Sequence, residues 1–177
     1  ECNIGRKEQD DFAVRSHEKA NEAITKGLFD SQIVPVDVKG KNIGEDEGAN
    51  PTIGSIIRAM PDKAFFKKGG TVHAWNSCPI SDGASSFLVL TLEKAQELGI
   101  EPEAEIVSYA FAGLEPRIMG MGPAYAIPKA LQKANLGIGQ IDFWEINEAF
   151  ASQTLACQHK LGIRLEQLNV WGGAIAL

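Results

Sequence analysis

Residues 141–150 constrain the fold of this chain most, because an apolar run there passes directly into a helix-forming segment. The side chains of 141–146 are typical of a short buried strand. The run ends at Asn147, a residue type preferred at helix N-caps. The positions that follow share one face of a helix, at Phe150, Thr154, Cys157 and Leu161. The sequence therefore predicts a strand that turns at once into a helix with one buried stripe.

The corner between this strand and this helix is a candidate site for chemistry. A helix that begins there leaves backbone N–H groups free, beside the side-chain amide of Asn147. Donors in this arrangement suit negative charge that develops on a substrate oxygen. The alternative is that Asn147 only caps its helix.

Composition excludes two classes of protein. A chain of 177 residues with 44% hydrophobic and 23% charged residues can bury a globular core. The net charge of −6, without a cluster of Lys and Arg, argues against a nucleic-acid surface. No apolar run approaches the ~18 residues of a membrane span.

Cysteine and histidine spacing indicates neither a disulfide framework nor a metal site. The three cysteines are few and scattered, which favours a reducing compartment. Cys157 falls on the buried stripe of its helix and is expected to be inert packing. The histidines have no ligand spacing, so we predict no metal.

Periodicity and turn residues predict the other elements. Helices are expected over residues 7–26, 93–98 and 123–135. Strands are expected over residues 32–38 and 105–113, and the apolar run 85–92 fits either a buried strand or a buried helix. Residues 39–70 are expected to form an excursion with short helical pieces that must cover Ile53, Ile56, Ile57, Phe65 and Phe66. Strands and helices alternate from residue 105 onward, which indicates α/β layers.

Gly120 and Gly122 suggest a dinucleotide-binding loop only superficially. Tyr125 stands where the third glycine of G-x-G-x-x-G would be, so a cofactor loop is not expected. A tight turn that lets Met119 approach a ligand fits better, with Met119 as ordinary core as the alternative.

Four segments resemble signatures of the thiolase family, in the order and spacing of that family. They are Asn76 with residues 81–84 (N-x-x-x-x-S-D-G-A), residues 116–123 (P-x-x-M-G-x-G-P), residues 147–150 (N-E-A-F) and residues 169–177 (N-x-x-G-G-A-I-A-L). The resemblance covers nearly the whole chain and is weakest between about Lys39 and Ala74. It is closest to peroxisomal 3-ketoacyl-CoA thiolases.

The resemblance implies a layered, thiolase-like α/β fold that is incomplete in this chain. It would comprise the end of the N-terminal half, the loop domain and most of the first C-terminal βαβαβ unit. We expect residues 1–75 to form the tail of the N-terminal domain with the loop-domain region, and residues 76–177 a truncated C-terminal domain. The nucleophilic cysteine of the family is expected upstream of residue 1, and its histidine and acid/base cysteine after Leu177. The fragment alone is therefore expected to be inactive.

The implied reaction is thiolytic cleavage of a 3-ketoacyl-CoA to acetyl-CoA and a shortened acyl-CoA, in fatty-acid β-oxidation. Asn147 matches the asparagine that positions the oxyanion-hole water. Met119 matches a methionine that lies against the acyl and pantetheine portion of the substrate. Coenzyme A is a substrate here, and no separate cofactor is implied.

The resemblance also implies residues that border the substrate. Ala149 and Phe150 match neighbours of the acyl pocket, and Ser77 and Cys78 lie where the pantetheine tunnel is lined. Lys63 is a candidate for contact with the CoA phosphates, although solvated surface charge is the alternative.

Other functions stay open at this point. By resemblance, the family has Gly or Ala beside the pocket asparagine, Asn76, where this chain has Trp75. A bulky ring there is expected to force its neighbours apart, which favours a non-catalytic remnant that binds CoA esters or partners. A biosynthetic acetoacetyl-CoA thiolase is a second alternative, and a condensing ketoacyl synthase is disfavoured by the N-E-A-F stretch. By resemblance, the full-length protein would be a homodimer or homotetramer, peroxisomal, with a mitochondrial or cytoplasmic location as the alternative.

Overall fold

The structure, a computed structural model, describes residues 2–59, 64 and 66–177. The α-helices are α1 (Arg6–Thr25), α2 (Ile53–Ala59), α3 (Leu92–Leu98), α4 (Gly122–Ala134) and α5 (Ala151–Leu161). Short 3-10 helices are η1 (Ala74–Asn76), η2 (Pro116–Met121), η3 (Ile138–Gln140) and η4 (Leu165–Gln167). Strands β1 (Val36–Val38) and β2 (Lys41–Ile43) form an antiparallel hairpin. None of the described helices is long and apolar enough to cross a bilayer.

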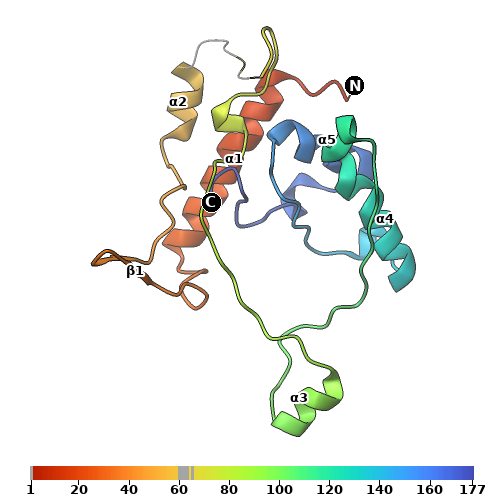
Figure 1. The fold of residues 1–177 in the computed structure, drawn as a ribbon. Coiled ribbons are helices and arrows are strands. Elements are labelled where there is room, and N and C mark those ends of the chain that lie inside the picture. Colours follow the sequence, from red (N-terminus) through yellow and green to blue (C-terminus); the bar gives the residue numbers. More distant parts are fainter. Residues whose placement is uncertain (1, 60–63, 65) are drawn as a thin grey trace.

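Helix α1 is the element on which the body of the molecule is built, and it packs on α5, α2 and η1 (Figure 1). The predicted helix is confirmed, and its inner face buries Phe12, Ala13, Ser16, Ala20 and Ala23. The helix ends as expected, because Gly27 takes a left-handed conformation with a φ of 66° directly after the cap. Ile24, which the same helical spacing would place on this face, is exposed.

Helix α5 also matches its prediction, with Thr154, Cys157 and Leu161 buried. It begins at Ala151, however, and Phe150 occupies its N-cap position. Asn147 lies three residues before that cap, so the prediction that the apolar run ends at a helix cap on Asn147 is wrong.

The predicted strand over 141–146 is an extended segment paired at one point. The backbone N–H of Trp144 donates to the Gln167 carbonyl, and the N–H of Asn169 donates to the Trp144 carbonyl, both at 2.8 Å. These two bonds place Trp144 parallel to Leu168. Residues 141–146 therefore pair through this single bridge and do not form a longer strand.

The excursion between 39 and 70 contains a short helix, as expected. Helix α2 buries Ile53 and Ile57 against the core. The strand predicted over 32–38 is reduced to the three residues of β1, whose side chains are all exposed. Phe65 lies outside the described residues. Phe66 is 72% exposed, although its ring packs edge-on against Phe150.

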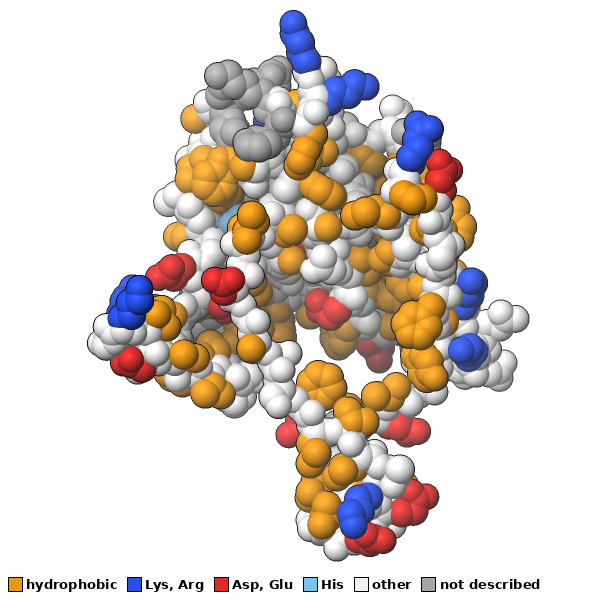
Figure 2. All heavy atoms as spheres, in the orientation of Figure 1, with side chains coloured by type: hydrophobic (Ala, Val, Ile, Leu, Met, Phe, Trp, Pro, Cys, Tyr) orange, Lys and Arg blue, Asp and Glu red, His pale blue; other side chains and the backbone are white. Residues whose placement is uncertain are grey.

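Two extended arms carry helix α3 away from the body of the molecule (Figure 1). Residues 79–90 and 101–114 form no backbone–backbone hydrogen bond with any described residue. Their apolar side chains are exposed, with Phe111 at 84%, and Figure 2 shows such side chains along both arms and α3. The buried strand predicted over 105–113 is therefore wrong for the described chain, and so is the buried strand or helix predicted over 85–92, where the family resemblance favours the strand. A strand needs a neighbouring strand for its backbone groups and a packed layer for its faces, and within the described chain no strand pairs with these segments.

The helices next to these arms lie where the sequence predicts them. Helix α3 ends at Gly99 in the left-handed region. Helix α4 ends at Asn135, also left-handed, and contains Pro128. The returning arm is attached to α4, because Ser108 Oγ donates to the Ala130 carbonyl at 2.8 Å.

Candidate active site

The segment that leads into α5 alternates between the core and the surface. Trp144, Ile146 and Glu148 are buried, whereas Phe143, Glu145 and Asn147 are exposed. This period of two is the pattern of an extended backbone with one buried face. Asn147 is thus exposed on the open face of this segment, four residues before the first residue of α5.

A buried hydrogen-bond network holds this segment from the inside. The Glu148 carboxylate accepts from Ser16 Oγ on α1 at 2.6 Å and from Asn169 Nδ2 at 2.8 Å. It also accepts from the backbone N–H of Ile175 at 3.2 Å. The network therefore joins α1, the segment 146–148 and residues 169–175.

Glu148, Ser16 and Asn169 were not predicted as site residues. The available signal was the alternation itself, because the inward positions of Trp144 and Ile146 place residue 148 inward as well. A carboxylate at an inward position needs donors around it. Asn169 and Ile175 lie in the N-x-x-G-G-A-I-A-L signature, but no sequence spacing indicates that they and Ser16 meet at Glu148.

Four of the predicted binding residues lie side by side. Ser77 and Phe150 form an antiparallel bridge, and the Cys78 N–H donates to the Ala149 carbonyl at 3.1 Å. Ser77 is buried and donates to the His73 carbonyl at 2.8 Å, whereas Cys78 is exposed. The start of α5 and the segment after η1 thus form one wall.

The turn before this wall is held by a hydrogen bond between a buried histidine and an aspartate. His73 Nε2 lies 2.7 Å from Asp10 Oδ1 on α1, and His73 Nδ1 accepts from the Trp75 N–H. Asn76 Nδ2 also donates to Asp10 Oδ1, at 3.1 Å. Asn76, matched to a pocket asparagine by resemblance, is therefore fully buried and serves the turn.

Trp75 does not force its neighbours apart. Its ring is 37% exposed and borders a cavity of about 400 Å³ that His17, Asn50, Ser77 and Ile175 also line. Burial lowers the pKa of His17, which accepts from the Asn50 N–H through Nδ1 at 3.1 Å. The bulky residue is accommodated at the edge of this cavity.

Met119 and Lys63 are not placed with that wall. Met119 lies on η2 and is 69% exposed, so it is not ordinary core. Its neighbour Gly120 packs closely on α5, because an added Cβ would lie 2.8 Å from Gln153 Cγ. Lys63 lies outside the described residues, so its place relative to the site is not described.

Cys157 is enclosed behind this turn. Its thiol lies 3.3 Å from the Gly120 carbonyl, and burial raises the pKa of the thiol. A protonated, buried thiol has neither the charge nor the access of a nucleophile. The described residues contain no group of three or more His, Cys, Asp and Glu side chains that could hold a metal.

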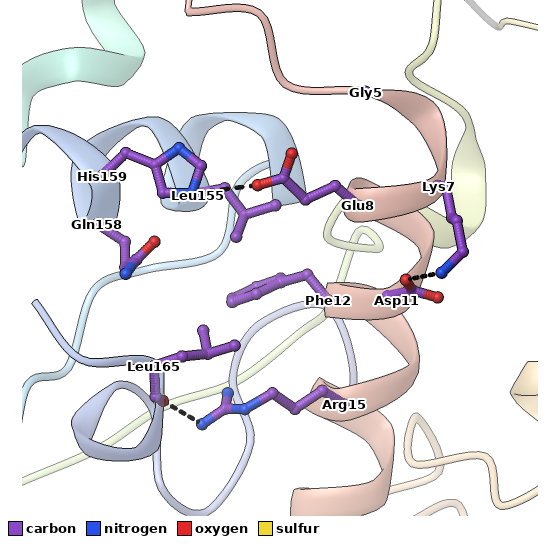
Figure 3. Close-up of a pocket in the computed structure, with 10 residues that line it drawn as sticks. All are labelled: Gly5, Lys7, Glu8, Asp11, Phe12, Arg15, Leu155, Gln158, His159 and Leu165. Carbon is purple, nitrogen blue, oxygen red and sulfur yellow. Dashed lines mark hydrogen bonds and ion pairs between the residues drawn. The ribbon is translucent and has the colours of Figure 1, made fainter.

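A second cavity, of about 580 Å³, lies between α1 and α5 (Figure 3). On one side Glu8 Oε1 lies 3.1 Å from His159 Nε2, and the Phe12 ring and Leu155 lie below this contact. Arg15 closes the other side, where its Nη2 donates to the Leu165 and Leu168 carbonyls at 2.7 Å. Desolvation lowers the pKa of Arg15, whose guanidinium is committed to these structural bonds.

Comparison with protein families identifies two matching domains. The profile of the thiolase N-terminal domain matches residues 1–93, and that of the thiolase C-terminal domain matches residues 100–177. The chain is 46% identical to 3-ketoacyl-CoA thiolase A, peroxisomal, of Mus musculus, covering 98% of this chain and 43% of the mouse protein. It is 45% identical to a probable acetyl-CoA acyltransferase of Staphylococcus epidermidis, covering 98% and 45%.

Solved structures agree with the sequence comparison. The dimeric peroxisomal thiolase of Saccharomyces cerevisiae superposes with a TM-score of 0.93 at 42% identity, covering 98% of this chain and 44% of the yeast chain. Human mitochondrial 3-ketoacyl-CoA thiolase in complex with CoA gives 0.88 at 37% identity, again covering 98% and 44%. The chain thus has an incomplete thiolase-like α/β fold that spans less than half the length of these relatives.

Proposed function

The chain belongs to the thiolase family, and we propose that it is part of a 3-ketoacyl-CoA thiolase. The reaction is cleavage of a 3-ketoacyl-CoA by free CoA, which yields acetyl-CoA and an acyl-CoA shortened by two carbons. The observation that carries the proposal is the outward carboxamide of Asn147, on a segment whose neighbouring residues are fixed by buried hydrogen bonds.

The role of Asn147 follows from the charge that moves in this reaction. A thiolate adds to the 3-keto carbon, and the bond between Cα and Cβ breaks as the carbonyl re-forms. The electron pair of that bond goes to the leaving acetyl-CoA as an enolate, whose thioester oxygen carries the charge until Cα is protonated. A fixed amide that orients a water toward this oxygen stabilises the charge where it develops. We assign that task to Asn147, as an oxyanion-hole residue.

The wall formed by Ser77, Cys78, Ala149 and Phe150 is proposed to border the substrate. Two of these residues contribute backbone bonds that hold the wall together, and the Phe150 ring contributes apolar surface. Met119 is proposed to contact the acyl portion, since an exposed thioether can adapt to apolar groups of different shape. Lys63 is proposed to contact CoA phosphates as a positive charge.

The cellular context is proposed from the relatives. Several of them are peroxisomal 3-ketoacyl-CoA thiolases, so we propose a peroxisomal location and a role in fatty-acid β-oxidation. The yeast relative is dimeric, and we propose a homodimer or homotetramer for the full-length protein. CoA and acyl-CoA are the proposed ligands, with no further cofactor.

A chimera tests this function directly. The 177 residues replace the aligned segment of the yeast thiolase, and thiolysis of acetoacetyl-CoA and longer 3-ketoacyl-CoA esters is compared with the unaltered yeast enzyme. We expect turnover in the folded chimera, and Asn147→Ala should lower kcat more than it raises KM. A folded chimera that binds CoA without turnover would favour the non-catalytic CoA-ester-binding alternative.

A further inference from the structure

Glu148 is the only Asp, Glu, Lys or Arg side chain that is fully buried in the described part of the chain, with an exposure of 0%. Burial of a carboxylate is costly unless hydrogen bonds replace its hydration. Here those bonds come from the neutral donors of Ser16, Asn169 and Ile175. Three hydrogen bonds to one buried carboxylate indicate a role other than packing.

The Asn169 carboxamide connects Glu148 to the backbone on the other side of Asn147. Its Oδ1 accepts from the Ile146 N–H at 2.9 Å, and its Nδ2 donates to the Ile146 carbonyl at 2.9 Å. The same Nδ2 donates to Glu148 Oε1 at 2.8 Å. Residues 146 and 148 are thereby tied to one rigid group, and Asn147 is the residue between them.

We infer that Glu148 is a positioning residue, which fixes the direction in which the Asn147 side chain leaves the backbone, from the opposite face of the extended segment. The inference rests on the proposed function, since it assigns Glu148 a task through Asn147. Alternating side chains point to opposite faces of an extended segment. Because the Ile146 backbone is bonded to Asn169 and the Glu148 side chain is anchored on the inner face, the Asn147 Cα–Cβ bond is fixed toward the open face. Pre-organised donors are effective because they need no reorganisation as charge develops.

The chemistry of a carboxylate suits this place better than that of an amide. Both carboxylate oxygens accept, and three donors converge on them. In Glu148→Gln, one of those oxygens becomes an NH2 group. Asn169 cannot turn to offer an oxygen to that group, because both ends of its carboxamide already bind Ile146. The conservative change therefore places two donors against each other and loosens the segment.

A double-mutant cycle in the chimera tests the inference. Glu148→Gln is expected to lower kcat about tenfold with KM nearly unchanged, as for loss of an interaction made in the transition state. In the Asn147→Ala background the same change should lower kcat by less than about twofold, because the residue being positioned is already gone. Glu145→Gln is the matched control, since Glu145 lies on the open face of the same segment, and it should leave kcat unchanged.

The outcomes separate the two proposals. Additive effects of Glu148→Gln and Asn147→Ala would overturn the positioning role and leave the proposed function intact. An unchanged kcat in Asn147→Ala alone would overturn both. If Glu148→Gln yields too little folded protein, Ser16→Ala takes its place, because it removes one donor to the carboxylate. It should lower kcat about threefold with the same non-additivity, whereas a lower melting temperature with unchanged kcat would assign the network to stability alone.

Discussion

The carboxylate of Glu148 occupies the space that a side chain on Gly173 would need. A Cβ built on Gly173 would lie 2.5 Å from the carboxyl carbon and 2.7 Å from each carboxylate oxygen. The N–H of Gly173 also donates to Ser16 Oγ, which itself donates to Glu148. The Glu148 carboxylate therefore fits only because residue 173 has no side chain.

Gly173→Ala should consequently destabilise the fold by about 2–3 kcal/mol, since the carboxylate cannot move without losing its three donors. Urea denaturation followed by circular dichroism measures the change. Gly83→Ala is the matched control, because an added Cβ there meets nothing within 4 Å. Equal effects of the two substitutions would show that steric conflict with Glu148 is not the cause.

Asp10→Asn should weaken the turn that carries Ser77 and Cys78. His73 Nδ1 accepts from the Trp75 N–H, so the Nε2 nitrogen carries the proton that faces Asp10. Loss of the charged acceptor should cost about 1–3 kcal/mol of unfolding free energy. Asp11→Asn removes an exposed partner of Lys7 and should have little effect. A comparable loss in both variants, measured by thermal unfolding, would contradict the structural role of Asp10.

The three cysteines should differ in reactivity. Cys2 and Cys78 are exposed, whereas Cys157 is buried and its pKa is raised by desolvation. We therefore expect two thiols to react quickly with a chromogenic disulfide reagent near neutral pH, and the third only after denaturation. Cys78→Ser should leave one fast thiol, whereas Cys157→Ala should leave two. Rapid reaction of Cys157 in the folded protein would contradict its enclosure behind Gly120.

Acid should destabilise the fold through His17. Burial lowers the pKa of this imidazole in the folded state, so the unfolded state binds the proton more readily. The stability that neutral His17 contributes is therefore complete above the ordinary histidine pKa of 6.5 and is lost as the pH falls below it. His17→Asn keeps an acceptor for the Asn50 N–H and should flatten the loss of stability between about pH 7 and 5, measured by urea denaturation. An unchanged pH profile would show that another group titrates.

The exposed arms should make the isolated chain self-associate. The side chains of Val107, Tyr109 and Phe111 are exposed on the returning arm, and the backbone beside them forms no backbone–backbone hydrogen bond within the described chain. Apolar segments with free backbone groups associate readily with similar segments. A Val107→Lys, Phe111→Lys double variant should shift the sedimentation profile toward monomer. Phe143→Lys is the control, because this exposed residue lies outside the arms. A chain that is monomeric without substitution would contradict the prediction.

Helices were predictable from the sequence because their bonds are local. The apolar spacing of α1 and α5 and the stops at Gly27, Gly99 and Asn135 all act within a few residues. Strands were not predictable in the same way. Residues 85–92 and 105–113 have the composition of buried strands, but a strand also depends on neighbouring segments for its pairing. Composition alone cannot supply those neighbours.

The site was predictable only in part, for a similar reason. The bridge between Ser77 and Phe150 brings together residues that the family resemblance had selected separately. The cap assigned to Asn147 failed because the chain stays extended through Glu148, whose donors lie on α1 and after residue 168. Only the folded chain brings these distant donors together.

Residues 79–114 connect two parts of the chain that are bonded to each other independently of that connection. Arg15 on α1 donates to the Leu165 and Leu168 carbonyls, Ser16 donates to Glu148, and the Cys78 N–H donates to Ala149. A single proteolytic nick between residues 79 and 114 would therefore leave two polypeptides that remain associated until they are denatured. The same two pieces, produced separately, could assemble the body of the molecule by complementation.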